Sequence, residues 1–194
     1  MRLFILFCIP VCVAIASCGS SETETKPKHV SNHSAEFNGS VGALMSNYYS
    51  LTEGFVNWDT AAINKQAKIM SVQIEHLDLN DLKRDSSVYQ TANNKLTNAK
   101  FDLSTIEKEQ DIANKRHALN DLTDHLFSFL KTAKFDQAPL YLQECPMAFN
   151  EKDTGLWLSK SSDIRNPYMG VHHPHYGKAM LECGDTRDSL DLTK

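Results

Sequence analysis

Apolar residues recur every three or four positions through the first two thirds of the chain, which is the spacing of an amphipathic helix. Four such stripes are separated by short polar breaks. They run at about 40–56, 59–77, 82–99 and 104–133. Short connections between amphipathic helices favour an antiparallel, up-down bundle, so we expect a mainly α fold of about four helices.

Two of the expected helix starts carry a capping signal. Asp59 precedes the second stripe, and aspartate is a preferred N-cap residue because its carboxylate accepts main-chain N–H groups. Ser104 and Glu107 form a capping box, from which we predict that the fourth helix opens at Ser104. No proline lies between Lys28 and Ala138, so nothing in that stretch of sequence interrupts a helix covalently.

The pattern changes after Lys134. Two apolar runs, 139–149 and 156–159, flank a polar turn that contains Gly155, and this arrangement predicts a β-hairpin. Residues 178–184 are predicted to form one short helix, closed by Gly184 as a C-cap. The expected fold is therefore a helical bundle with a small C-terminal β-hairpin and a short terminal helix.

The chain begins with a positive charge at Arg2 and an uncharged apolar run over 3–16, and we interpret residues 1–17 as a secretory signal peptide. Residues 15–19, Ile-Ala-Ser-Cys-Gly, resemble the lipobox of bacterial lipoproteins. We therefore expect lipidation of Cys18, since several acyl chains on one residue anchor a protein stably to a membrane. The alternative is an ordinary signal peptide that ends in cysteine.

Residues 18–38 are then the lipidated cysteine and a flexible tether, because this segment holds too few apolar residues to bury a core. The folded domain is expected over 39–194, a length that suits one core. These expectations place the protein in the cell envelope, on the periplasmic side or the cell surface. Its lipid anchor is the expected contact with the membrane.

Charge and motifs narrow the classes of function. The chain has 194 residues, with 20 Lys and Arg against 24 Asp and Glu, for a net charge of −4. A nucleic-acid-binding protein ordinarily shows a basic surplus, so no nucleic-acid partner is expected. The sequence contains no G-x-S-x-G, P-loop, H-E-x-x-H or dinucleotide-binding motif, and we expect no enzymatic activity.

Sulfur-containing residues are concentrated in the C-terminal third, where Cys145 and Cys183 are the two cysteines of the expected domain. Cys145 and Met147 are two positions apart, so in a strand both side chains lie on one face. Met180 and Cys183 are three apart, and in a helical turn they too share a face. Two thiols and two thioethers form a soft ligand set that favours Cu(I), with zinc a weaker option once the thioethers are counted.

Two other arrangements of these residues stay open. Two cysteines in an exported domain ordinarily pair, so Cys145 and Cys183 are also a candidate disulfide, with the methionines as core filler. His172, His173 and His175 form a second cluster, whose imidazoles suit Cu(II), Zn or Ni. A solvated loop without a metal is the more ordinary role for such a cluster.

The most distinctive segments of the C-terminal third are 145–149 (Cys-Pro-Met-Ala-Phe), 157–159 (Trp-Leu-Ser), 164–168 (Ile-Arg-Asn-Pro-Tyr) and 180–184 (Met-Leu-Glu-Cys-Gly). On these residues the chain resembles the domain-of-unknown-function 3347 family, over about 41–184. That family occurs in Gram-negative lipoproteins and is also found fused to periplasmic adaptor subunits of heavy-metal efflux systems.

The resemblance implies a helical bundle with a small β appendage, a periplasmic role near copper or related heavy metals, and no enzymatic activity. It carries over Cys145, Met147, Met180 and Cys183 as candidate metal ligands. The expected function is Cu(I) capture or transfer, with a metal-efflux or copper-handling envelope protein as partner. The alternative is a disulfide-stabilised interaction module that binds an envelope partner without metal.

Overall fold

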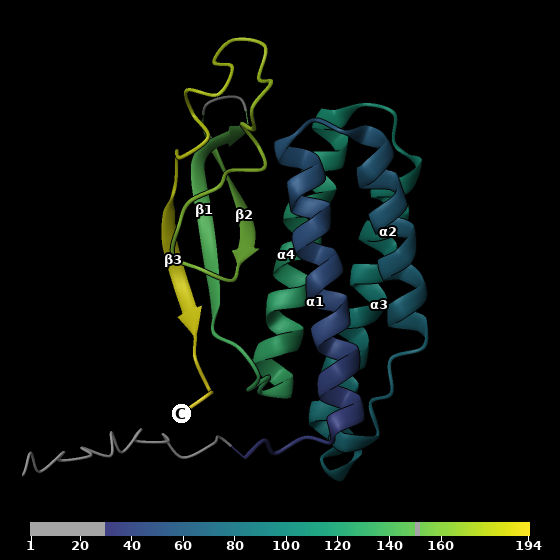
Figure 1. Cartoon of the computed structure of the whole chain (residues 1–194). Helices are drawn as coiled ribbons and strands as arrows, with labels where there is room; N and C mark the ends of the chain where they lie inside the picture. The colour runs from purple at the N-terminus through teal and green to yellow at the C-terminus, as the bar shows by residue number, and fades with distance from the viewer. Residues whose placement is uncertain (1–29, 150–151) are drawn as a thin grey trace, which may run out of the picture.

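Four long helices stand side by side, and a small sheet lies against them (Figure 1). The structure, a computed structural model, describes residues 30–149 and 152–194. The helices are α1 (Ala35–Val56), α2 (Thr60–Glu75), α3 (Ser86–Lys108) and α4 (Ile112–Ala133), with a 3-10 helix, η1 (Asn80–Arg84), before α3. The prediction of a mainly α up-down bundle is confirmed. The predicted signal peptide and Cys18 lie outside the described residues.

Each of the four α-helices begins after a side chain that accepts a main-chain N–H group, as the free N–H groups of a first turn require. The four N-caps are Ser34, Asp59, Asp85 and Asp111. Asp59 was predicted for this role, but the prediction that a helix opens at Ser104 is wrong. The buried Leu103 and Ile106 continue the apolar stripe of α3 through that point, and Asp111 then caps α4.

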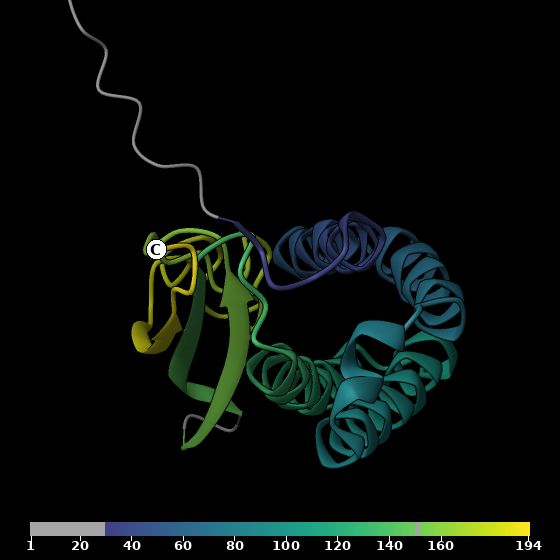
Figure 2. The ribbon, with the colours of Figure 1, turned by 90° about the horizontal axis from the view of Figure 1, so that it is seen from below.

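The interior of the bundle consists of the apolar stripes seen in the sequence. In α1 the stripe is fully buried, at Val41, Leu44, Tyr48, Leu51 and Phe55. Viewed from below, the helices follow one another around an arc in chain order, so each packs against the next (Figure 2). Removal of this apolar surface from water is the main force that holds the helices together.

The folded part begins earlier than the boundary predicted at residue 39. Helix α1 starts at Ala35, and the segment before it is fastened to the end of the bundle. The Ser31 hydroxyl donates to the Asp136 carboxylate at 2.7 Å, and the Asn32 N–H donates to its other oxygen at 3.1 Å. Within the described part of the chain, no helix has the length and apolar character needed to cross a membrane.

The sheet has three antiparallel strands in the order β2–β1–β3. The strands are β1 (Leu140–Phe149), β2 (Asp153–Ser159) and β3 (Asp185–Leu190). The predicted hairpin corresponds to β1 and β2, whereas β3 was not predicted. Strand β2 runs beside the bundle, and β3 lies on the far edge of the sheet (Figure 1).

The predicted short helix over 178–184 is wrong, because this segment forms consecutive turns that lead into β3. Two of its carbonyl groups accept hydrogen bonds from outside the segment. The carbonyls of Leu181 and Cys183 both accept from Asn166. Gly184 is also no helix cap. It has φ +146°, and a Cβ there would lie 2.6 Å from the Glu144 carbonyl oxygen, so the chain enters β3 at a place that only glycine fits.

Side chains of the bundle cover the open edge of β2. The Leu156 N–H donates to the Asn120 side-chain oxygen at 3.0 Å, and the Leu158 N–H donates to the Tyr48 hydroxyl at 3.1 Å. Unpaired strand edges otherwise attract other chains, so these bonds both dock the sheet on α1 and α4 and satisfy its outer N–H groups.

Candidate functional site

The sulfur atoms of Cys145 and Cys183 lie 3.9 Å apart, although the two residues are 38 positions apart in the sequence. Cys145 is fully buried in β1, and Cys183 is half-buried just before β3. Both are free thiols. The structure thus brings together the two cysteines that the sequence singled out, one in β1 and one in the turns that lead into the neighbouring β3.

The distance between the two sulfurs distinguishes a disulfide bond from a pair of ligands to one metal ion. A disulfide requires an S–S distance of about 2.05 Å, so the pair is not bridged. Two sulfurs bound tetrahedrally to one metal ion, with bonds of about 2.3 Å as in zinc–thiolate sites, are about 3.8 Å apart. The observed 3.9 Å is close to that value, so the pair fits one soft metal ion with little movement.

Local structure in β1 fixes the position of Cys145. The residue pairs with Gly155 of β2, and the regular register between the strands is then lost until Phe149 pairs with Asp153. Pro146 follows Cys145 and has no N–H group to continue the ladder. A Cβ at Gly155 would meet the ring of Tyr168 at 2.7 Å, so the glycine leaves room for close packing beside the thiol-bearing strand.

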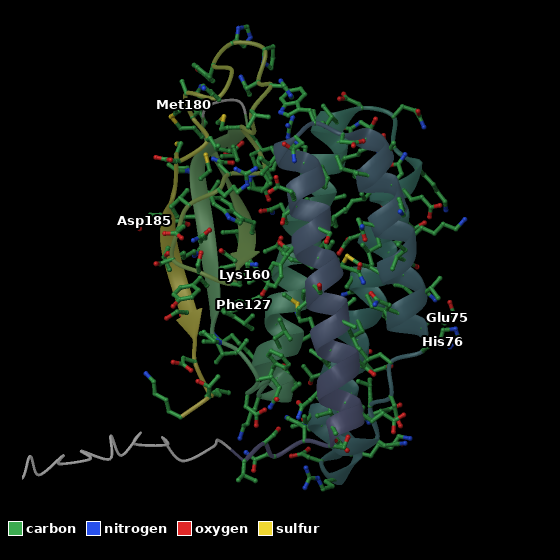
Figure 3. The ribbon with its side chains drawn as sticks, viewed as in Figure 1. Glu75, His76, Phe127, Lys160, Met180 and Asp185 are labelled. Atoms are coloured by element: carbon green, nitrogen blue, oxygen red, sulfur yellow. The ribbon has the colours of Figure 1, made fainter. Side chains whose placement is uncertain are left out.

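The two methionines lie on the same segments as the cysteines and are half-buried against the core. The Cys183 N–H donates to the Met180 carbonyl at 3.1 Å, so these two residues share one turn, although not a helix. Figure 3 shows Met180 near the end of the sheet at which β3 begins. The expectation of one strand face for Cys145 and Met147 is weakened, because the irregularity in β1 lies between Cys145 and Phe149.

The surroundings of Cys183 favour its neutral thiol when no metal is bound. Burial raises the pKa of the Cys183 thiol, and the nearby Cys145 sulfur raises it further. A metal ion must therefore displace a proton to bind Cys183, and its positive charge supplies the stabilisation that the empty site lacks.

The His-rich loop does not form a compact ligand cluster. His172 and His175 are exposed, whereas His173 is half-buried. The Nδ1 atom of His173 accepts main-chain N–H groups of His175 and Tyr176 at 3.3 and 3.4 Å. Across the described residues, no three His, Cys, Asp or Glu side chains gather closely enough to hold a metal ion. The candidate centre thus consists of the two thiols of Cys145 and Cys183.

Sequence reasoning missed the residue that holds Cys183 in place. Asn166 is fully buried, and its side-chain amide donates to the Cys183 carbonyl at 2.7 Å. Asn-Pro at 166–167 is a local turn signal, but nothing local in the sequence indicates a bond to a residue 17 positions later.

One family model matches the helical part of the chain and ends before Cys145. A family model described as "Protein of unknown function (DUF3347)" matches residues 44–138. This match covers most of α1 and all of α2, α3 and α4, and it is shorter than the 41–184 expected from the sequence. No curated protein and no solved structure matches the chain.

Proposed function

We propose that this chain, which belongs to the domain-of-unknown-function 3347 family, binds one soft metal ion between Cys145 and Cys183, and that this ion is Cu(I). The observation that carries the proposal is the 3.9 Å contact between two unbridged thiols. Thiolates and thioethers are soft ligands, and Cu(I) is a soft ion that such ligands select.

The thioethers argue for copper over zinc. Met180 shares a turn with Cys183, and Met147 follows Cys145 by two positions. Neutral thioether sulfur is a poor ligand for Zn²⁺ but suits Cu(I). We propose Met147 and Met180 as weaker, exchangeable donors beside the two thiolates, and we give His172, His173 and His175 no part in the first coordination shell.

The exposure of the site suits transfer as well as storage. Cys145 is inaccessible, whereas Cys183 is half-exposed, so a ligand from another protein has one side from which to approach. With lipid at Cys18, the domain would present this site at the membrane surface of the envelope. A metal-efflux or copper-handling envelope protein is the partner we propose.

Anaerobic titration of the reduced protein with Cu(I), in competition with a chromogenic chelator, tests the metal site. We expect one Cu(I) per chain, and loss of binding in Cys145→Ser and in Cys183→Ser. Met147→Leu and Met180→Leu should each weaken binding without abolishing it. The double variant His172→Asn/His175→Asn is the matched control and should bind as the parent does. Equal uptake by either cysteine variant contradicts the proposal.

The same contact supports a second candidate, a disulfide-stabilised interaction module without metal. The two sulfurs would have to approach from 3.9 Å to about 2.05 Å, which a small shift of the half-exposed Cys183 provides. A thiol count separates the candidates. Two reactive thiols, counted after protein isolated without reductant is unfolded in the presence of a metal chelator, support the metal site, and none supports the bridge.

A further inference from the structure

We propose that Asn166 is the positioning residue of the metal centre, which fixes Cys183 at the right distance from Cys145 by holding its main chain. This inference rests on the function proposed above, but it concerns a residue that contributes no ligand. Cys183 lies in a stretch of turns before β3 begins at Asp185, so the regular sheet does not by itself fix the position of its sulfur.

Asn166 binds the Cys183 segment at two points. Its side-chain Nδ2 donates to the Cys183 carbonyl at 2.7 Å, and its main-chain N–H donates to the Leu181 carbonyl at 2.8 Å. One carbonyl lies two residues before Cys183, and the other belongs to Cys183 itself. Movement of the Cys183 main chain away from Cys145 therefore requires that these two hydrogen bonds be broken.

The remaining polar groups of Asn166 hold its own orientation. Its Oδ1 accepts the N–H groups of Tyr168 and Met169 at 2.8 and 3.1 Å. Its main-chain carbonyl accepts the Gly170 N–H at 2.9 Å. The side chain is fully buried, and rotation of the amide would place a donor against two donors. One rotamer is thus strongly preferred, with Nδ2 directed at Cys183.

The segment that carries Asn166 is in turn fastened to the helices. Arg165 forms a two-point ion pair with Glu53 of α1, with N–O distances of 2.7 and 2.5 Å. The Trp58 indole N–H donates to the Met169 carbonyl at 3.2 Å, and the Val171 N–H donates to the Val56 carbonyl at 2.8 Å. A continuous set of contacts thus runs from the bundle through Asn166 to Cys183.

This arrangement explains how a bundle without ligands contributes to a metal site in the sheet. Partners that orient a ligand without touching the metal commonly change metal affinity by about 10–100-fold when they are removed. Asn166 fits that role because it fixes the ligand-bearing main chain before any metal arrives, which lowers the cost of ordering on binding.

The test compares Asn166→Asp with Asn120→Asp. The first keeps the oxygen that accepts from Tyr168 and Met169 but replaces the donor to Cys183 with an acceptor. The second makes the same chemical change at Asn120, whose Oδ1 accepts from the Leu156 N–H of β2 and makes no bond to the Cys183 segment. Far-UV circular dichroism of each variant checks that the helices are intact.

Two quantities are measured: Cu(I) affinity by competition, and the rate of disulfide formation between Cys145 and Cys183 with diamide, which takes two electrons and two protons from the thiols. We expect Asn166→Asp to lose about tenfold or more in affinity and to form the disulfide correspondingly more slowly, with the control unchanged in both. Unchanged values in a folded Asn166→Asp protein overturn the inference.

Two further outcomes are also decisive. If the parent protein binds no Cu(I), the proposed function fails, while the diamide rate still tests whether Asn166 holds the thiols together. If Asn166→Asp does not fold, Glu53→Gln replaces it, because that substitution loosens the same segment at the surface. A slower diamide reaction in Glu53→Gln supports the positioning role, and an unchanged rate contradicts it.

Discussion

The hydroxyl of Tyr48 in α1 accepts the main-chain N–H of Leu158 in β2 at 3.1 Å, which joins the bundle to the sheet through one buried oxygen. The same oxygen lies 2.7 Å from the hydroxyl of Thr123 in α4. Thr123 donates its hydrogen to the Leu119 carbonyl at 2.8 Å, so Tyr48 must be the donor to Thr123. Burial raises the pKa of Tyr48 far above its usual value, so it remains a neutral donor.

Replacement of Tyr48 by Phe should loosen this junction. The change leaves the Leu158 N–H buried without a partner, which costs about 1–3 kcal/mol of unfolding free energy. Urea denaturation of Tyr48→Phe measures the loss. Tyr89→Phe, at a half-buried position of α3 outside this network, is the control and should change stability by less than about 0.5 kcal/mol. Equal stability of the two variants would show that the junction contributes nothing.

Gly184→Ala should disturb the proposed metal site through the backbone. The added Cβ would lie 2.6 Å from the Glu144 carbonyl oxygen and 2.9 Å from the Trp157 ring, at a φ of +146° that alanine rarely adopts. We expect a loss of more than about 1 kcal/mol of stability, together with weaker Cu(I) binding at the adjacent Cys183. Thermal unfolding and the copper titration measure the two effects.

The matched control for Gly184→Ala is Gly42→Ala in α1. A Cβ there meets nothing within 4 Å, and the residue is exposed within a helix. Alanine in a helix interior is favoured over glycine by about 1 kcal/mol, so this variant should be more stable than the parent and bind copper equally. A stabilised Gly184→Ala protein would contradict the close packing described here.

Copper affinity should rise with pH across the thiol range. The pKa of Cys183 is raised above its ordinary value of 9.0, so Cys183 is protonated below that pH and each bound metal displaces its proton. The apparent affinity should therefore increase by about tenfold per pH unit for that proton, up to pH 9.0 and beyond. Competition titrations over a pH series measure it, and a plateau well below pH 9.0 would exclude Cys183 as the titrating ligand.

The Glu53–Arg165 ion pair should contribute stability that acid removes. Arg165 lowers the pKa of Glu53 below its ordinary value of 4.5, so the contribution is present above pH 4.5 and lost as the pH falls through the lower native pKa. Both side chains are nearly half exposed, which limits the gain to below about 1 kcal/mol. The difference in unfolding free energy between the parent and Glu53→Gln should vanish in strong acid and shrink at high salt. A difference that grows in acid would contradict this account.

The helices were predictable because their signal is local. The spacing of Val41, Leu44 and Tyr48 repeats with the helix period, and burial follows from it. The error at Ser104 arose because a capping box is also local, and the stripe through Leu103 and Ile106 outweighed it. Capping costs or gains about 1 kcal/mol, less than burial of two large aliphatic side chains.

The third strand and the candidate site could not be predicted in full, because they depend on contacts between residues far apart in the sequence. Strand β3, Asp-Thr-Arg-Asp-Ser-Leu, has no apolar alternation and is a strand only because it pairs with β1. The chemistry of Cys145 and Cys183 was readable from residue type, but their 3.9 Å contact, the Asn166 bond to Cys183 and the close approach at Gly184 all join residues far apart in the sequence. Those are long-range relationships, and only the structure revealed them.

Copper K-edge X-ray absorption of the Cu(I)-loaded protein tests the central claim most directly, because it reports the atoms bound to the metal. We predict a first shell of sulfur alone, supplied by Cys145 and Cys183 with thioether support, and no copper retained in the double variant Cys145→Ser/Cys183→Ser. A first shell of nitrogen or oxygen, or a copper spectrum that persists in the double variant, would contradict the account.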